Sequence, residues 1–387
     1  MIAPAPPLDV LQLGMGWFPQ QAGGLNRYFQ DLIGALPGAG ISPHALVAGD
    51  PQPQIDDPVT IAADRSARLP RRLLAFRRAT ARAMRDVRPS LIASHFALYG
   101  AAAPRPADLP RVVHFHGPWA DECRREGESS LGHRLKTQLE RHAYRGAERY
   151  IVLSQAFQDV LINTYRVAPE RVEVIPGGVD TQRFHPADGR EAARRQMGWP
   201  TDRPIVLAVR RLVPRMGLDR LLQAFARVAR HHPDALLIIA GRGPLLEPLR
   251  QLAQALGLDN HVRFTGYLPD EDLPAANRAA DLAVVPTESL EGFGLITLEA
   301  LASGTPVLVT PVGGLPEVVR PFAPELVFAD GEPATLASHL TEALSQPAWL
   351  PSPEACATYA RDGFAWPVIA GRIAQLYRDV AAEGPTP

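Results

Sequence analysis

The stretch PTESLEGFGLITLEA, residues 286–300, decides how the surrounding chain is interpreted. An apolar run beginning at Leu282 leads into it, glycines follow at positions 292 and 294, and a helix-forming run comes next. This order predicts a strand, then a turn that exposes backbone N–H groups, then the start of a helix. Helix N-termini carry unpaired donors and a partial positive charge, so the stretch predicts a site for an anion such as phosphate.

Two carboxylates flank the predicted anion site. Glu291 comes just before the expected helix, and Glu299, eight positions later, lies in its early part. A carboxylate can accept hydrogen bonds from two neighbouring hydroxyls, which a sugar or a ribose offers. The rest of the chain is therefore interpreted as the housing of a site for an anion with sugar hydroxyls beside it.

The composition is that of an ordinary globular protein, with 46% apolar and 21% charged residues. A chain of 387 residues is long for one hydrophobic core and sufficient for two domains. The formal net charge of −1 gives no field that would attract nucleic acid as the main partner. Lys136 is the only lysine, so a Schiff base to a cofactor could form only there.

The two cysteines and the N-terminus favour a cytoplasmic protein. Cys123 and Cys356 are far apart and match no metal-ligand spacing, which favours a reducing compartment. Residues 1–7 are rich in proline and lack the basic and apolar segments of a signal peptide. No apolar run approaches the ~20 residues that a membrane-spanning helix needs.

Short apolar runs alternate with helical patterns in both halves of the chain, which predicts α/β domains with parallel sheets covered on both faces. Residues 50–64 are interpreted as a surface loop and residues 326–328 as the last strand. Two doubly wound domains would place a ligand cleft between them. The expected division is 1–186 for the first domain, 187–204 for a linker with several prolines, 205–365 for the second domain and 366–387 for a final helix.

The region from Leu69 to Arg88 has an apolar stripe at helical spacing and many arginines on its other faces. One interpretation is a helix packed on a sheet with a solvated basic face, which is the commoner case in globular domains. The other is peripheral contact with an anionic membrane.

Arginines and glycines follow several predicted strands of the second domain. Arg210 and Arg211 end one strand and Arg215 opens the next helix, and a guanidinium matches the geometry of phosphate. Gly241 and Gly243 end another strand, where glycine lets a ligand approach the backbone.

In the first domain, the pair Gly23-Gly24 could approach a diphosphate, but it lacks the full dinucleotide-binding fingerprint. His116 ends the strand 112–116, where it could orient a reacting sugar, with a structural histidine as the alternative. His114 shares its face of the strand but lies farther from the end. The acidic triplet 270–272 follows Pro269 and is interpreted as a helix start, so no metal is assigned.

The combined motifs resemble the retaining glycosyltransferases of family 4, which have the GT-B fold of two Rossmann-like domains that face a cleft. The strongest match is EGFGLITLEALASGTPV at 291–307, followed by TPVGGLPEVV at 310–319. The resemblance implies that the C-terminal helix packs back on the first domain. The other matches, in chain order, are QAGGLNRYFQDL, HFHGP, VIPGGVD, RRLVPRMG, IIAGRGP and VRFTGYLPDEDL.

The resemblance also implies roles for individual residues. Glu299 would hold the ribose hydroxyls of a nucleotide sugar, Glu291 would contact the transferred sugar, and Arg211 would neutralise the leaving diphosphate. Gly24 would lie close to the phosphate and His116 near the reacting sugar. The implied catalytic residues are His116, Arg211 and Glu291, and the implied donor-binding residues are Gly23, Gly24, Arg210, Arg215, Gly241, Gly243, Leu268, Gly292, Phe293, Gly294, Leu295 and Glu299.

One position departs from the family pattern. The family usually has a lysine five residues after the phosphate-binding arginine, where this chain has Met216. Arg215 is the expected substitute, although neighbouring side chains on a helix point about 100° apart.

The resemblance implies a transferase that moves a sugar from a nucleoside diphosphate, with UDP favoured over GDP, to a glycan, lipid-linked or natural-product acceptor. No metal or other cofactor is expected, and retention is expected through attack of the acceptor on the face that the leaving group vacates. The acceptor would lie near Trp17, Trp119 and Arg124. The alternatives are a sugar-nucleotide epimerase and a non-catalytic nucleotide-sugar or glycan-binding module; a pyridoxal phosphate phosphorylase would need a lysine that the second domain lacks.

Overall fold

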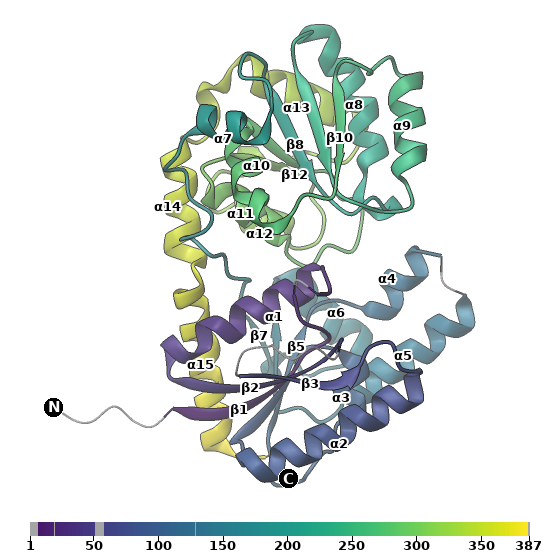
Figure 1. Ribbon diagram of the computed structural model, residues 1–387, viewed down its shortest axis with the longest axis vertical. Helices are drawn as coiled ribbons and strands as arrows, with labels where there is room; N and C mark the ends of the chain where they lie inside the picture. Colours follow the sequence, from purple (N-terminus) through teal and green to yellow (C-terminus); the bar gives the residue numbers. More distant parts are fainter. Residues whose placement is uncertain (1–6, 19, 51–57, 128, 386–387) are drawn as a thin grey trace, which may run out of the picture. The chain divides into compact units, whose positions relative to one another are not determined.

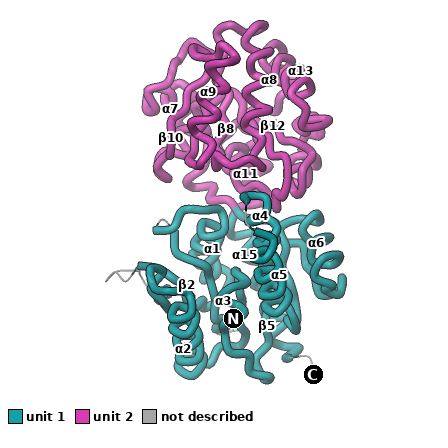
Figure 2. Tube along the Cα trace, turned by 90° about the vertical axis from the view of Figure 1, so that its right-hand side faces the viewer, with its two compact units in different colours: residues 1–178, 366–387 teal, residues 179–365 magenta. Residues whose placement is uncertain are grey.

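The structure, a computed structural model, describes residues 7–18, 20–50, 58–127 and 129–385. The chain forms two compact units (Figure 2). Unit 1 contains residues 1–178 together with 366–387, and unit 2 contains residues 179–365. Each unit is built on one parallel sheet, so the two are described separately.

Unit 1 contains a seven-stranded sheet in the order β3-β2-β1-β4-β5-β6-β7, and all neighbouring strands are parallel. The order changes direction between β1 and β4, as in a doubly wound fold. Its strands are β1 (Leu8–Leu13), β2 (Ile41–Gly49), β3 (Val59–Asp64), β4 (Leu91–Ser94), β5 (Arg111–Phe115), β6 (Arg149–Val152) and β7 (Val172–Val174).

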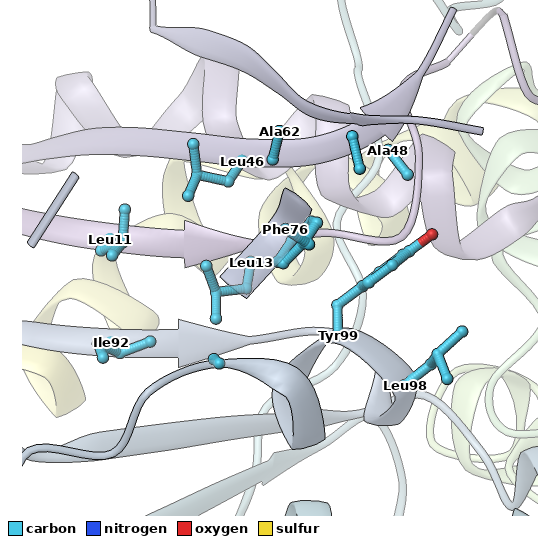
Figure 3. Close-up of a cluster of buried hydrophobic side chains, with 11 residues drawn as sticks. Leu11, Leu13, Leu46, Ala48, Ala62, Phe76, Ile92, Leu98 and Tyr99 are labelled. Carbon is cyan, nitrogen blue, oxygen red and sulfur yellow. The ribbon is translucent and has the colours of Figure 1, made fainter. Parts of the chain in front are cut away.

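Side chains alternate between the two faces of this sheet. On β1, Leu11 and Leu13 pack with Phe76 and Tyr99 in one core cluster, shown in Figure 3. The residue between them, Gln12, contacts Tyr377 on the other face. Both faces are therefore covered, as expected for a parallel sheet.

The helices of unit 1 include the last one of the chain, α15, which contacts α1 and β4 (Figure 1). This confirms that the C-terminal helix packs on the first sheet. The helices are α1 (Gly24–Ala35), α2 (Leu69–Val87), α3 (Ala97–Ala102), α4 (Trp119–Arg125), α5 (Ser130–Tyr144), α6 (Gln155–Tyr165) and α15 (Trp366–Glu383), with 3-10 turns η1 (Leu36–Ala39) and η2 (Pro169–Arg171).

Unit 2 contains a five-stranded parallel sheet in the order β10-β9-β8-β11-β12. Here the order changes direction between β8 and β11, so this sheet too is doubly wound. The predicted α/β class with two doubly wound sheets is confirmed. The strands are β8 (Ile205–Val209), β9 (Leu236–Ala240), β10 (Val262–Gly266), β11 (Leu282–Val285) and β12 (Val307–Val309).

The stretch 187–204, expected as a linker, contains helix α7, which packs against α10. Ala193 of α7 lies in one cluster with Ile205 and Leu207 of β8, so this segment is part of the core of unit 2. The helices of unit 2 are α7 (Arg190–Met197), α8 (Leu218–His231), α9 (Leu246–Ala255), α10 (Leu273–Ala279), α11 (Leu295–Ala302), α12 (Leu315–Val319), α13 (Pro333–Ser345) and α14 (Pro353–Phe364), with 3-10 turns η3 (Pro214–Met216), η4 (Asp270–Asp272), η5 (Pro324–Leu326) and η6 (Pro347–Trp349).

Two local predictions were wrong. Residues 50–64, expected as a loop, end in the edge strand β3, which pairs with β2; residues 51–57 of this stretch lie outside the described residues. Val59 and Ile61 are β-branched and suit a strand, but the preceding prolines obscured the pattern. Residues 326–328, expected as a strand, make one bridge, from Val327 to Val309, after the 3-10 turn that begins at Pro324.

Candidate active site

The predicted site residues of unit 2 gather where the strand order changes direction. Arg210 directly follows β8, and Thr287 and Glu291 follow β11, the neighbouring strand. Because the strands are parallel, their carboxyl ends lie at one edge, which is where doubly wound sheets bind ligands.

Glu291 and Arg210 form an ion pair at this edge. The side chain of Glu291 is 15% exposed and that of Arg210 is 8% exposed. Nη2 of Arg210 also donates to the Thr287 hydroxyl, which donates to the Glu291 carboxylate over 3.3 Å. Burial by itself raises the pKa of Glu291, but the charges of Arg210 and Arg215 and the hydrogen bonds from Arg210 and Thr287 outweigh burial and lower it. Glu291 is therefore a carboxylate at neutral pH.

Arg215 supports the turn that carries Glu291. Its side chain is buried, and Nη1 donates to the carbonyl of Leu290 over 2.9 Å. Leu290 has a positive φ of 55°, which is a strained conformation for leucine. Residues with strained backbones of this kind cluster at functional sites. Met216, at the position of the family's lysine, is buried and uncharged, whereas position 215 carries a guanidinium.

Glycines near this edge are required by the backbone itself. A Cβ at Gly241, whose φ is 149°, would lie 1.8 Å from the carbonyl oxygen of Arg210. A Cβ at Gly243 would lie 2.3 Å from the carbonyl oxygen of Leu212. The expected reason for these glycines was the approach of a ligand, but close contact between the ends of β8 and β9 is sufficient.

A further glycine, which the sequence did not single out, holds the Glu291 turn. Gly313 has a φ of 56°, and a Cβ there would lie 1.9 Å from the carbonyl oxygen of Glu291. The next residue, Gly314, donates its N–H to the same carbonyl over 3.0 Å. The segment 310–314 therefore fixes the backbone of Glu291.

The predicted helix start after this turn is α11, which begins at Leu295 after Gly294. Gly294 has a φ of 82°, and a Cβ there would lie 2.5 Å from the Leu315 side chain. Phe293 is buried and its ring contacts Phe364, so Phe293 anchors the turn. Gly292 and Glu299 are partly exposed, with Glu299 in the second turn of α11.

Two other residues predicted to bind the donor, Arg211 and Leu268, lie outside the Glu291–Arg210 ion pair. Arg211 is exposed, while its neighbour Arg210 is the one paired with Glu291. Leu268 is partly buried and packs against the core cluster that contains Trp199.

In unit 1, Gly23 and Gly24 lie at the N-terminus of α1. Gly23 has a φ of 148°, which favours glycine. A Cβ at either position would meet no atom within 4 Å, so both residues are open on the side of the missing side chain.

Three histidines, His95, His114 and His116, gather at the carboxyl ends of β4 and β5. Among the described residues, they form a group whose ligand nitrogens lie within 4.8 Å of one another. His95 and His114 are buried and stack with ring centroids 4.0 Å apart, while His116 is partly exposed. Hydrogen bonds within and around the group connect it to Tyr377 of α15.

This hydrogen-bonded chain defines the tautomer of each ring. Gln12 donates from its amide nitrogen to the Tyr377 hydroxyl over 3.3 Å, and its oxygen accepts from Nε2 of His95 over 2.9 Å. Nδ1 of His95 is then the acceptor for Nε2 of His116, 3.3 Å away. The Tyr377 hydroxyl donates to Nε2 of His114 over 2.6 Å, so Nδ1 of His114 carries the hydrogen toward the Tyr28 hydroxyl.

The neutral form of all three rings is favoured by burial. Burial lowers the pKa of His95 and of His114 well below the usual value, and lowers the pKa of His116 to about 3. Since His116 donates from Nε2, its Nδ1 has a free lone pair. His116 can therefore accept a hydrogen bond from a hydroxyl at neutral pH, where its ring is uncharged.

Family models match most of the chain. The model described as Glycosyltransferase Family 4 matches residues 22–183, and the model described as Glycosyl transferases group 1 matches residues 189–363. The chain belongs to glycosyltransferase family 4. The fold and the family inferred from the motifs are thereby confirmed, and the two clusters described above lie in a glycosyltransferase.

Named relatives of this glycosyltransferase agree with the assignment. It is 31% identical over 309 residues to a D-inositol 3-phosphate glycosyltransferase of Corynebacterium kroppenstedtii, which covers 76% of this chain and 68% of the relative. It is 32% identical over 323 residues to a Mycobacterium tuberculosis protein named GDP-mannose-dependent alpha-(1-6)-phosphatidylinositol monomannoside mannosyltransferase, with 78% and 80% covered. Among solved structures, a sucrose-phosphate synthase from Thermosynechococcus elongatus matches with a TM-score of 0.78 and 25% identity, covering 97% of this chain and all of that one.

The buried pair at the unit 2 site should be strongly coupled. Removing one partner of a buried ion pair costs about 3–5 kcal/mol, while exposed pairs contribute about 0–1 kcal/mol. We expect Glu291→Gln and Arg210→Gln each to lower the free energy of unfolding by several kcal/mol, and the double variant to lose less than the sum. Urea unfolding measures this, with Arg250→Gln, which breaks the exposed pair with Glu247, as the control. Equal losses for Glu291→Gln and Arg250→Gln would contradict the coupling.

The histidine chain should depend on the Tyr377 hydroxyl. Tyr377→Phe leaves the Gln12 amide and Nε2 of His114 without a partner in a buried place, which costs about 1–3 kcal/mol. We also expect a mixture of tautomers at His95 and His116, because the Gln12 amide is free to turn over. Histidine nitrogen NMR measures the tautomers. Tyr165→Phe, which removes the hydroxyl that donates to Glu140, is the matched control and should change stability but not the tautomers.

Proposed function

We propose that the protein transfers a sugar from a nucleoside diphosphate sugar to an acceptor with retention of anomeric configuration. The observation that carries this proposal is the ionised, partly buried Glu291, placed between β11 and the N-terminus of α11 and held by Arg210 and Arg215. A carboxylate in this place can accept hydrogen bonds from sugar hydroxyls, while the helix start attracts the phosphates. Glu299, in the second turn of α11, would accept from the ribose hydroxyls.

The leaving diphosphate would be stabilised without a metal ion. Arg210, Arg211 and Arg215 follow β8 and the N-terminus of α11 follows β11, so these positive groups belong to neighbouring strands of unit 2. Positive groups that are already in place lower the barrier because they need no reorganisation as charge develops. The Glu291 carboxylate is already bonded to Arg210 and Thr287, which fits a role in holding the sugar better than a role as a covalent nucleophile. We therefore propose attack by the acceptor on the face that the leaving group vacates.

His116 would orient the transferred sugar. Its Nδ1 lone pair can accept a hydrogen bond from a sugar hydroxyl, and its Nε2 is held by His95. Gly23 and Gly24, with open space in front of them, would lie against the diphosphate. No protein cofactor is part of this proposal, since the nucleotide sugar is itself a substrate.

The donor base and the acceptor need a direct assay. We propose UDP-sugars ahead of GDP-sugars as donors, and glycan, lipid-linked or natural-product acceptors. The M. tuberculosis relative is named as GDP-mannose-dependent, so GDP-sugars belong in the same panel.

The test is release of free nucleotide from a panel of UDP- and GDP-sugars, with and without acceptors. We expect one donor to be used, with a product whose anomeric configuration, measured by NMR, matches that of the donor. Glu291→Gln should lower the rate by about 10²–10³, the usual loss when one electrostatic contact to the transition state is removed. Glu247→Gln, an exposed carboxylate of α9, is the control and should leave the rate unchanged.

Other outcomes would select the alternatives. Conversion of a UDP-sugar to another UDP-sugar without any acceptor would support an epimerase. Thermal stabilisation by a nucleotide sugar without turnover of any donor would support a binding module. An inverted product would contradict the retaining mechanism.

We further propose peripheral contact between α2 and anionic lipid. Its arginines at positions 71, 77, 78, 82 and 85 are exposed, as are Leu69 and Leu74. None of the helices in the described part of the chain is both long and apolar enough to cross a bilayer. An exposed basic helix with apolar residues at its start suits a surface contact.

Sedimentation with vesicles tests this contact. We expect binding to vesicles rich in phosphatidylglycerol that weakens with salt, and none to phosphatidylcholine. Arg78→Gln with Arg82→Gln should weaken binding roughly 30-fold, since each basic residue near an anionic surface contributes about 1 kcal/mol. The matched control is Arg227→Gln with Arg230→Gln, two exposed arginines of α8. Equal binding by both double variants would count against the contact.

A further inference from the structure

Unit 1 contains a cavity that the donor-site residues do not line. Its volume is about 320 Å³, and its wall includes Met15, Arg65, Arg72, Phe96, Tyr99 and Trp119. Met15 follows β1, Arg65 follows β3, and Phe96 and Trp119 follow β4 and β5, so the cavity lies at the carboxyl edge of the unit 1 sheet. Its size is at the lower end for small-molecule sites, and its place is where doubly wound sheets bind ligands.

The charge in the cavity wall comes from two arginines with different surroundings. Nε of Arg65 pairs with the Asp50 carboxylate at 2.7 Å, which offsets its charge. Arg72 donates from Nη1 to the carbonyl of Arg65 over 3.0 Å, a bond that leaves its charge uncompensated. Because Asp50 offsets Arg65, the cavity wall carries one excess positive charge, that of Arg72.

Arg72 also has an unused donor. Its Nε is buried and has no hydrogen-bond partner in the structure. A buried donor without an acceptor costs about 1–3 kcal/mol, and more when the group is charged, so the guanidinium of Arg72 is under-satisfied where it stands. The exposed arginines of α2 face solvent, whereas Arg72, on the same helix, is partly buried in the cavity wall.

Aromatic side chains make up much of the rest of the cavity wall. Tyr99 and Arg72 both line the cavity, and the charge of Arg72 opposes the rise that burial causes in the pKa of Tyr99. The ring of Tyr99 is fixed by stacking on Phe76, with centroids 4.3 Å apart, and its hydroxyl end points toward Ala48 in Figure 3. Phe96 and Trp119 pack edge to face at 5.2 Å and form another wall. The cavity thus combines an anion-binding fork with rigid apolar walls.

We propose that this cavity binds the acceptor through a phosphate group that the acceptor carries, with Arg72 as the main ligand and Arg65 as the second. The inference rests on the proposed transfer reaction, for which it names the class of acceptor. A guanidinium offers parallel N–H donors that match phosphate oxygens. The single hydrogen bond of Arg72 within the described part of the chain, from Nη1 to the Arg65 carbonyl, leaves other donors of the guanidinium unused. The phosphate can belong to a small phosphorylated polyol or sugar or to a phospholipid headgroup, because the cavity binds the phosphate group that these molecules share.

Binding is tested first without any donor turnover. The probe is phenyl phosphate, titrated into the intact protein by calorimetry in the presence of saturating UDP, with phenol as the neutral comparison. We expect phenyl phosphate to bind more tightly than phenol, and Arg72→Gln to weaken it by about 10–100-fold, the worth of a hydrogen bond to a charged group. Arg85→Gln, an exposed arginine of the same helix, is the matched control and should bind as the wild type does.

A second variant separates loss of binding from loss of folding. Arg72→Lys keeps the charge but not the fork, so we expect a folded protein with intermediate affinity. Equal affinity in wild type, Arg72→Gln and Arg85→Gln would overturn the proposal, as would binding that appears only when UDP is left out, because the probe then occupies the nucleotide site.

The kinetic arm uses the donor identified by nucleotide release. Phosphorylated acceptors should be used better than their dephosphorylated forms, and Arg72→Gln should raise KM for the phosphorylated acceptor about tenfold or more. Soluble sugar phosphates and vesicles that contain phosphatidylinositol distinguish the two sources of phosphate. If no donor releases nucleotide, the transfer reaction is contradicted. The phenyl phosphate titration then tests phosphate binding in the cavity by itself. Transfer to neutral acceptors with equal efficiency would overturn the cavity proposal and leave the transferase intact.

Discussion

The parallel direction of the strands is the constraint on which the rest of each unit depends. Because all neighbouring strands run the same way, most of the described connections between strands contain a helix, and all strand carboxyl ends meet at one edge of each sheet. The residues of chemical interest follow from this. Arg210 and Glu291 meet although they are 81 positions apart, and His95 meets His116 across neighbouring strands.

Both edges hold polar groups in defined states by pairing them in partly dry surroundings. In unit 2, arginines keep a buried carboxylate ionised against the effect of burial. In unit 1, a chain of neutral groups from Tyr377 through Gln12 and His95 leaves His116 with one acceptor. A low local dielectric strengthens such hydrogen bonds and ion pairs and makes an unpaired polar group costly. Each site is therefore rigid, because its polar groups are held by partners. The glycines at 241, 243 and 313 also contribute to this rigidity. They let backbone segments approach closely enough to fix the chain around Arg210 and Glu291.

The sequence was sufficient for features that local patterns encode. The α/β alternation, the helix start after Gly294 and the family motifs depend on neighbouring residues, and the structure contains them. Features that depend on packing could not be predicted in this way. Whether Arg210 or Arg211 reaches Glu291 depends on which way the chain turns after β8, and no local pattern pairs Tyr377 with His114, 263 positions away. His95, a polar residue at a strand end, carried the one sequence signal that could have pointed to the histidine cluster.

The path of the chain through the two units has a consequence for synthesis. Unit 1 is completed by α15, whose Tyr377 is fully buried against β1 and β5, yet α15 is made after the whole of unit 2. While the ribosome is still translating unit 2, the first sheet lacks a covering helix, and Gln12 and His114 lack their partner. Domains generally fold in order as they emerge, but here the first sheet cannot reach its final packing until α15 has left the ribosome. Unit 2, which is continuous in sequence, is free to fold first.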